Sequence, residues 1–182
     1  MADPVIVLDY DPTWPALFQS LRQRIADALG DMAAAIEHVG STAVPNLAAK
    51  PIIDIDVLLA SETMLGAAVE RLAKLGYVHR GDLGVPGREA FRARASDPRH
   101  HLYVCPPSSV SFRRHVAFRD YLRAHPMDAK TYGDLKMALA ERFRDDRVAY
   151  NTAKGEFVEE VTRQGMATSE GAPLNQVSQG LR

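Results

Sequence analysis

The sequence predicts an α/β protein of the α+β type, in which a mixed β-sheet is flanked by helices and followed by a helical lobe. Three observations lead to this prediction. Short apolar runs typical of strands fall within the first 105 residues, helical spacing dominates from about residue 109 onward, and 182 residues suit one domain. We therefore expect a single domain over residues 1–165, with its sheet in about 1–105 and its helical lobe in about 109–163.

The first half of the chain alternates strand and helix patterns. Residues 5–8 are a short strand candidate, and Asp11-Pro12 suits the start of a helix that ends at Gly30. Residues 36–39 and 52–59 have the apolar character of strands, and residues 40–49 form a turn between them. Ser61 can cap a second helix, in which apolar residues recur from Leu65 to Leu75.

The second half begins with a glycine-rich loop, residues 81–87, which we expect to flank a site. Residues 91–94 and 101–105 predict a hairpin of two strands. Helices follow at about 109–124, 127–144 and 146–163, and Pro126 separates the first two. Residues 166–182 hold few apolar side chains, which predicts a flexible tail.

Composition narrows the classes of function. The net charge is −1, with 22 basic and 23 acidic side chains, so no overall positive field exists to hold a nucleic acid. Cys105 is the single cysteine and cannot form an internal disulfide. The start of the chain resembles no signal peptide, and acids interrupt the apolar runs. We expect a cytoplasmic protein that has neither nucleic-acid nor membrane partners.

The strongest chemical signal is Gly40-Ser41, followed after twelve residues by Asp54-Ile55-Asp56. Side chains two apart on a strand face the same side, so the two carboxylates converge. A solvated strand edge would also carry two acids, but the surrounding aliphatic residues favour a buried strand. Oxygen ligands of this kind suit Mg²⁺ on a polyphosphate, and a Gly-Ser turn suits an anion.

Residues 37–56, EHVGSTAVPNLAAKPIIDID, closely resemble the signature of the GrpB family. The resemblance continues through residues 101–104, 114–123, 132–136 and 150–154, and covers most of residues 5–163. That family is assigned to the nucleotidyltransferase superfamily, whose general pattern is an hG[GS] turn followed by a DxD or DxE strand. The resemblance thus implies the nucleotidyltransferase fold.

The resemblance also implies roles for particular residues. Gly40, Ser41 and Thr42 would contact phosphate, while Asp54 and Asp56 would hold Mg²⁺, or Mn²⁺ in its place. The implied substrate is a nucleoside triphosphate, with ATP as the first candidate, and the acceptor is an unknown small molecule or protein.

Active members of the superfamily commonly place a third carboxylate on a neighbouring strand. If residues 101–104 form that strand, His101 or Tyr103 occupies the position, and Glu89 and Asp97 are the nearest acids in sequence. Either His101 serves as the base, or transfer is slow or absent.

Several basic residues are secondary candidates. Lys50 either reaches a phosphate or pairs with an acid, and Arg114, Arg119 and Lys154 either close over the triphosphate or lie on solvated helix faces. A zinc site is disfavoured because adjacent histidines, His100 and His101, point to opposite faces of a strand. The helical stripe that starts at Tyr132 predicts core packing.

Three hypotheses follow. The first is a magnesium-dependent enzyme that moves a nucleoside monophosphate from a nucleoside triphosphate to an acceptor. The second is a catalytically weak or inactive nucleotide-binding or partner-binding module, which relatives joined to dephospho-CoA kinase would connect with coenzyme A metabolism. The third is a phosphohydrolase that uses the same metal ions on water.

Overall fold

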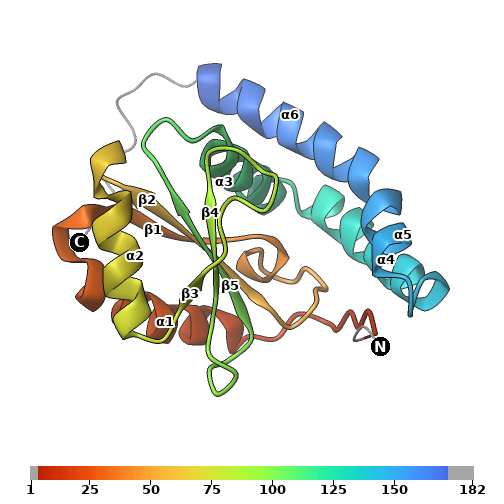
Figure 1. Cartoon of the computed structure of the whole chain (residues 1–182). Helices are drawn as coiled ribbons and strands as arrows, with labels where there is room; N and C mark the ends of the chain where they lie inside the picture. The colour runs from red at the N-terminus through yellow and green to blue at the C-terminus, as the bar shows by residue number, and fades with distance from the viewer. Residues whose placement is uncertain (1–3, 172–182) are drawn as a thin grey trace.

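The computed structural model describes residues 4–171, and its centre is a five-stranded mixed sheet (Figure 1). The strands are β1 (Ala33–Val39), β2 (Ile53–Leu59), β3 (Val78–His79), β4 (Glu89–Arg92) and β5 (His100–Cys105), in the spatial order β1-β2-β5-β4-β3. The β2-β5 pair is parallel and the other three pairs are antiparallel. The predicted mixed sheet and the predicted β4-β5 hairpin are therefore confirmed.

Two helices cover one face of the sheet, α1 (Trp14–Leu29) and α2 (Leu65–Lys74) (Figure 1). Every third or fourth residue of α1 is buried, from Trp14 to Leu29, and these side chains pack on Ile53, Ile55 and Val57 of β2. Burying each large aliphatic side chain stabilises the fold by roughly 1.5–3 kcal/mol. The core on this side holds β2 rigidly, so the opposite face of β2 is available for chemistry.

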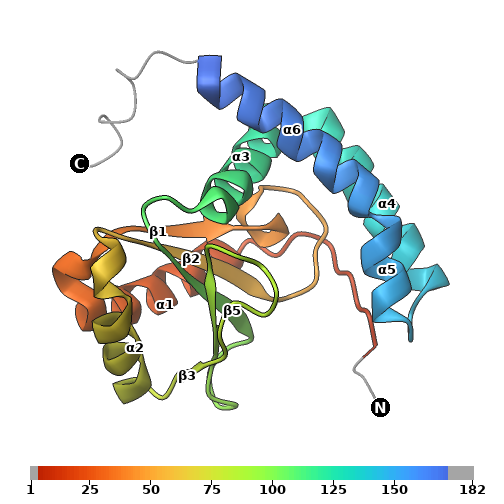
Figure 2. The same ribbon diagram turned by 45° about the horizontal axis from the view of Figure 1, so that its top comes forward.

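The carboxyl-terminal helices form a separate layer (Figure 2). They are α3 (Val110–Ala124), α4 (Pro126–Arg142), α5 (Arg147–Ala153) and α6 (Gly155–Gly171). Helices α3 and α6 pack closely along their length, and a smaller core of Val44, Leu47, Phe118, Leu122 and Val161 joins this lobe to the segment after β1. Among residues 4–171, no helix has the length and apolar character that crossing a membrane requires.

Three boundaries differ from the sequence predictions. Residues 5–8 form no strand, because Val5 packs on Leu139 and Tyr150 of the lobe and Leu8 makes a single bridge to Ala49. The helix predicted over 146–163 is two helices, divided at Lys154, where glycine follows as a poor helix former. Helix α6 continues to residue 171, beyond the predicted end of the domain, and the rest of the predicted tail lies outside the described residues.

Candidate functional site

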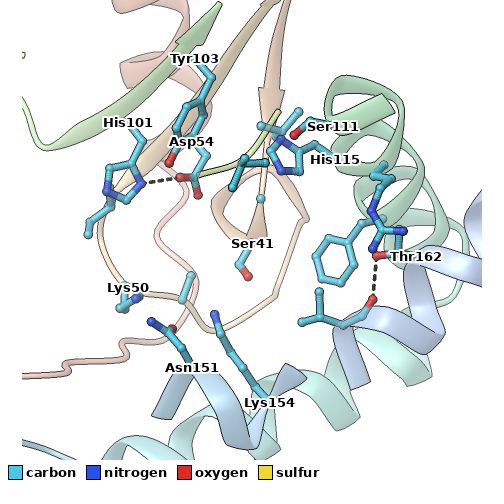
Figure 3. A pocket seen from close by; sticks show the side chains of 18 of the residues that line it. Ser41, Lys50, Asp54, His101, Tyr103, Ser111, His115, Asn151, Lys154 and Thr162 are labelled. Carbon is cyan, nitrogen blue, oxygen red and sulfur yellow. Dashed lines mark hydrogen bonds and ion pairs between the residues drawn. The ribbon is translucent and has the colours of Figure 1, made fainter. Parts of the chain in front are cut away.

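The two aspartates of β2 lie on the sheet face opposite α1 and α2. Across the parallel pair with β5, Asp54 stands beside His101 and Asp56 beside Tyr103. Figure 3 shows Asp54, His101 and Tyr103 together at one side of a cavity of about 670 Å³. The strand alternation predicted from the sequence therefore brings the acids and the two β5 side chains onto one face.

A histidine contacts each aspartate. His101 Nδ1 donates to Asp54 Oδ1 at 2.7 Å, and His115 Nδ1, from α3, donates to Asp56 Oδ2 at 2.7 Å. Asp56 is 0% exposed, and its second oxygen, Oδ1, has no hydrogen-bond partner among the described residues. Burial raises the pKa of the Asp56 carboxyl, although the hydrogen bond from His115 opposes the shift. A buried carboxylate with a free oxygen is a place for a cation.

The turn after β1 approaches the acids closely. Gly40 has a φ of 69°, which favours glycine, and Ser41–Ala43 is a short 3₁₀ helix. Thr42, which the sequence assigns to phosphate, is 1% exposed; its hydroxyl accepts from His38 Nε2 at 3.0 Å and donates to the Ile52 carbonyl at 3.4 Å. Thr42 thus ties the turn to β2, and it lines the cavity together with Gly40 and Ser41.

Two arginines of α3, the buried Arg119 and the exposed Arg123, fix the position of this turn. Arg119 is 7% exposed and donates to Glu37 at 2.5 Å and to the His38 carbonyl at 3.0 Å. Arg123 Nε donates to the Ala43 carbonyl at 3.0 Å. Arg119 therefore neither contacts phosphate nor lies on a solvated helix face, because its side chain joins the lobe to β1.

Three lysines line the cavity, Lys50 from the segment before β2 and Lys136 and Lys154 from the lobe. Lys50 and Lys154 lie across from Asp54 (Figure 3), and both lie over the ring of Tyr150, at 5.3 and 5.2 Å from its centroid. Lys136 is 2% exposed, its Nζ has no hydrogen-bond partner among the described residues, and it lies 4.4 Å from the Tyr132 ring centroid.

Burial, the largest cause, and repulsion from neighbouring cations lower the pKa values of these lysines. The pKa of Lys136 falls to about 6 and that of Lys154 to about 8, with burial as the larger cause in both. Lys50 and Lys154 repel the ammonium form of Lys136, whereas Asp54 favours it. The three lysines are therefore arranged for an anion that supplies the missing negative charge.

Buried polar atoms without a partner are concentrated at this site. In residues 4–171 they are Asp56 Oδ1, Arg88 Nε, Lys136 Nζ and the Tyr150 hydroxyl. Arg88, Lys136 and Tyr150 line the cavity, Asp56 lies on its sheet face, and Arg88 lies 4.2 Å from the Tyr103 ring centroid. Buried polar groups are normally satisfied, so this concentration indicates that the site is completed by a ligand.

The remaining predicted residues lie at the edge of the site or away from it. Arg114 lines the cavity but its guanidinium pairs with Glu159 at 2.7 Å. Glu89 pairs with His79 at 2.6 Å, and Asp97 accepts from Arg94 at 3.0 Å, so neither acid reaches Asp54. The position beside the acid pair on β5 is held by His101 and Tyr103.

The histidine pair divides between the two faces of the sheet. His100 is 7% exposed and accepts from the Tyr77 hydroxyl at 2.7 Å, while His101 faces the cavity. No group of three or more histidine, cysteine or acidic side chains is arranged to hold a metal ion in residues 4–171.

The donor set nevertheless fits Mg²⁺ in the way the sequence predicts. This ion is commonly held by one or two carboxylates together with substrate phosphates and water, and it does not require a cage of protein ligands. Asp54 and Asp56 supply two carboxylates on one strand face, and the unpartnered Oδ1 of Asp56 is an oxygen of the kind that ligates Mg²⁺.

Sequence reasoning missed Lys136, Arg88 and Tyr150. Lys136 follows Tyr132 by one helical turn, so both belong to a face that the apolar stripe assigned to the core. The loop predicted to flank a site does so, since Val85 and Pro86 line the cavity, and Arg88 directly after the loop lines it too. A signal was available in residues 132–136 and 150–154, which carry part of the family resemblance.

Gly40→Ala should displace the Asp54 carboxylate, because a Cβ at residue 40 would overlap Asp54 Oδ2 and the backbone φ is positive. Gly81 is a matched control, with a φ of 72° and nothing within 4 Å of the place that a Cβ would take. We expect Gly40→Ala to weaken magnesium-dependent nucleotide binding by about 10-fold or more, whereas Gly81→Ala should lose only the stability that backbone strain costs, about 1–2 kcal/mol. Calorimetry and thermal unfolding of both variants test this, and equal nucleotide affinity in the two would contradict it.

Comparisons with known proteins identify the family of the chain. The family model described as GrpB protein matches residues 4–164. The chain is 33% identical to the glutamate-rich protein GrpB of Alkalihalophilus pseudofirmus, covering 86% of this chain and 93% of that protein. It is 35% identical to protein YqkA of Bacillus subtilis over 85% of this chain, but spans only 45% of that protein. A dephospho-CoA kinase of Mycolicibacterium paratuberculosis is 31% identical over 83% of this chain and 43% of its own length.

Solved structures place the fold. The crystal structure of GrpB from Enterococcus faecalis superposes with a TM-score of 0.83 at 33% identity, over 91% of this chain and 99% of that chain. The Cid1 poly(U) polymerase with bound MgGTP superposes with a TM-score of 0.51 at 14% identity, over 75% of this chain and 45% of that one. The predicted nucleotidyltransferase-like fold is therefore confirmed.

Proposed function

The chain belongs to the GrpB family, and we propose that it is a magnesium-dependent nucleotidyltransferase, which moves a nucleoside monophosphate from a nucleoside triphosphate to an acceptor hydroxyl. The observation that carries this proposal is one cavity with two kinds of unsatisfied charge. Asp54 lines its sheet side, with Asp56 buried on the same face of β2, and the unpartnered Lys136 lies with Lys50 and Lys154 on the opposite side. A magnesium triphosphate is complementary to both.

The side opposite the acids would bind the triphosphate. Lys50, Lys136 and Lys154 provide three ammonium groups, and Gly40-Ser41 provides a close backbone approach with a hydroxyl. Charge-assisted hydrogen bonds to phosphate oxygens are among the strongest in proteins, particularly where water is excluded. Arg114, held by Glu159 at the cavity edge, would reach the phosphates only if it released that pair.

The sheet side would hold the metal ion. Asp54 and Asp56 would be the ligands, and Mn²⁺ would suit the same oxygens. When bound, the ion would neutralise charge on the phosphate oxygens during displacement. His115 positions Asp56 through its 2.7 Å hydrogen bond, and His101 positions Asp54 in the same way.

In the reaction, the acceptor oxygen attacks the α-phosphorus, the bond from that phosphorus to the bridging oxygen breaks, and pyrophosphate leaves. The acceptor proton passes to His101, whose Nδ1 is engaged by Asp54, so that Nε2 is the nitrogen that accepts it. His101 would thus act where other members of the superfamily use a third carboxylate. ATP is the first candidate for the nucleotide.

The position of the third acid also favours a second candidate, a nucleotide-binding module with little or no catalysis. Tyr103 stands beside Asp56 on β5, and the Arg88 guanidinium covers its ring, so a cation partly occupies the place of an acid. The similarity to dephospho-CoA kinases would connect such a module with coenzyme A metabolism.

Calorimetry with ATP, GTP, CTP and UTP, each with and without Mg²⁺, followed by an assay for released pyrophosphate, separates the candidates. Transfer predicts magnesium-dependent binding and pyrophosphate release that requires Asp54 and His101. Binding without pyrophosphate release in the presence of a broad set of hydroxyl acceptors would favour the module, and absence of binding would reject both.

Nucleotide binding should take up protons. Lys136 is mostly neutral at pH 7 because its pKa is about 6, and a triphosphate beside its Nζ would raise that pKa. Bound protein therefore holds more protons than free protein above pH 6, so affinity should fall as the pH rises from 6 toward 9. Calorimetry in buffers of different ionisation enthalpy measures this uptake, and Lys136→Met should reduce it. Release of protons on binding would contradict the assignment.

A further inference from the structure

A second groove, of about 440 Å³, continues the cavity along the sheet. Ile52, His101, Tyr103 and Arg147 line both spaces, so the groove opens beside the proposed base. Its other walls come from β4, from the turn between β4 and β5, and from the loop after β3.

Strand alternation explains why side chains of β3 and β4 share this groove with the acid site. Ala90 stands opposite Tyr103, and Arg92 is two residues further on, so Arg92 is on the face of Tyr103 and His101. Val78 pairs with Arg92, and Arg80 is two residues after Val78, so Arg80 is on that face too. The groove is thus a direct extension of the surface that carries Asp54 and Asp56.

Arginine dominates the charge of this groove. Five arginines line it and one acid does, Asp97, which is already paired with Arg94 at 3.0 Å. The arginines are Arg80, Arg92, Arg94, Arg99 and Arg147. Among residues 4–171, neither Arg80 nor Arg92 has a hydrogen bond or ion pair through its side chain. In a protein with a net charge of −1, this is a local excess of positive charge.

We propose that the groove binds the acceptor substrate, and that this acceptor is a small molecule carrying a phosphate or carboxylate group as well as the hydroxyl that attacks. That the bound anion is the acceptor depends on the proposed transfer reaction. The presence of an anion site depends on the groove alone. Arginine forks suit both oxyanions in a bidentate geometry. An anionic group held by Arg80 and Arg92 would place the rest of the molecule beside His101.

The chemistry favours a small anion over a nucleic acid. The overall charge provides no long-range field for a phosphate backbone, and the arginines of this site line one short groove beside the acid site. A compact anion needs only this local charge.

The test titrates sn-glycerol 3-phosphate, succinate and a ten-nucleotide RNA separately into the protein. Each titration is done with and without Mg²⁺ and a non-hydrolysable ATP analogue, and calorimetry and NMR measure the binding. The expected result is binding of one or both small anions in the presence of the analogue, weakened about 10-fold or more in Arg80→Gln/Arg92→Gln. Arg22→Gln on α1, which lines neither space, should leave the anion affinity unchanged.

Comparing the arms identifies the anion and separates this inference from the proposed function. Tighter binding of glycerol phosphate than of succinate indicates that the acceptor carries a phosphate. Tighter binding of succinate indicates that it carries a carboxylate. If the parent protein binds a small anion but not the ATP analogue, the transfer reaction is rejected and the anion site is retained. Absence of anion binding, equal weakening in Arg22→Gln, or tight RNA binding that depends on Arg80 and Arg92 would each overturn the inference.

Discussion

Asp54→Asn and Asp56→Asn are each expected to abolish magnesium-dependent nucleotide binding and pyrophosphate release. Asparagine preserves shape but removes the charge that holds a divalent cation, and Asp56 Oδ1 is the buried oxygen with no other partner among the described residues. A metal ion contributes several kcal/mol to stabilising the charge that develops at phosphorus, so turnover should fall by at least ~100-fold. Binding with and without Mg²⁺, and pyrophosphate release, measure the two effects separately.

Asp134→Asn is the matched control. Asp134 is an exposed acid whose ion pair with Lys130, at 2.6 Å, lies on the surface of α4. It should leave nucleotide binding unchanged. Thermal unfolding should show that Asp54→Asn and Asp56→Asn are folded, because the amide oxygen can still accept from His101 or His115. Full magnesium-dependent activity in either site variant would remove the proposed mechanism.

Lys136→Met is expected to stabilise the protein while it weakens nucleotide binding. Methionine fills similar space without the amine, whose Nζ is buried and has no partner among the described residues. The pKa of Lys136 is lowered from 10.5 to about 6, so at pH 7 the unfolded chain binds a proton that the folded protein releases. This opposes folding by a free energy on the order of a few kcal/mol. Nucleotide affinity should fall about 10-fold through loss of one charged contact.

The pH dependence gives this prediction a distinct sign. Between pH 6 and 10.5 the unfolded state holds more protons at Lys136 than the folded state, so this lysine makes the stability rise with pH across that range. The slope should shrink in Lys136→Met. Lys130→Met, at an exposed lysine, should change neither the slope nor nucleotide affinity. A lower free energy of unfolding in Lys136→Met than in the parent protein at pH 7 would show that the amine has a stabilising partner.

Local patterns were sufficient for most of the fold. Side chains of β2 and β5 alternate between the two sheet faces, and every third or fourth residue of α1 is buried. These patterns follow from the strand period of 2.0 residues and the helix period of 3.6 residues, which depend only on residues close together in the sequence. The predicted strand at residues 5–8 failed because Val5 has its partners in α4 and α5, more than 130 residues away. Apolar character predicted its burial but not against which surface it would pack.

The sequence by itself determined the acid pair, the Gly-Ser turn and the faces on which they lie, because backbone periodicity and glycine's conformational freedom are local properties. Only the tertiary structure decided that Lys136 from α4 and Lys154 beside α6 face those acids across one cavity, and that His115 from α3 contacts Asp56. Charge becomes chemically significant through distance and burial. Distance and burial are set by packing between segments that are far apart in the sequence, and no local sequence pattern predicts which of those segments meet.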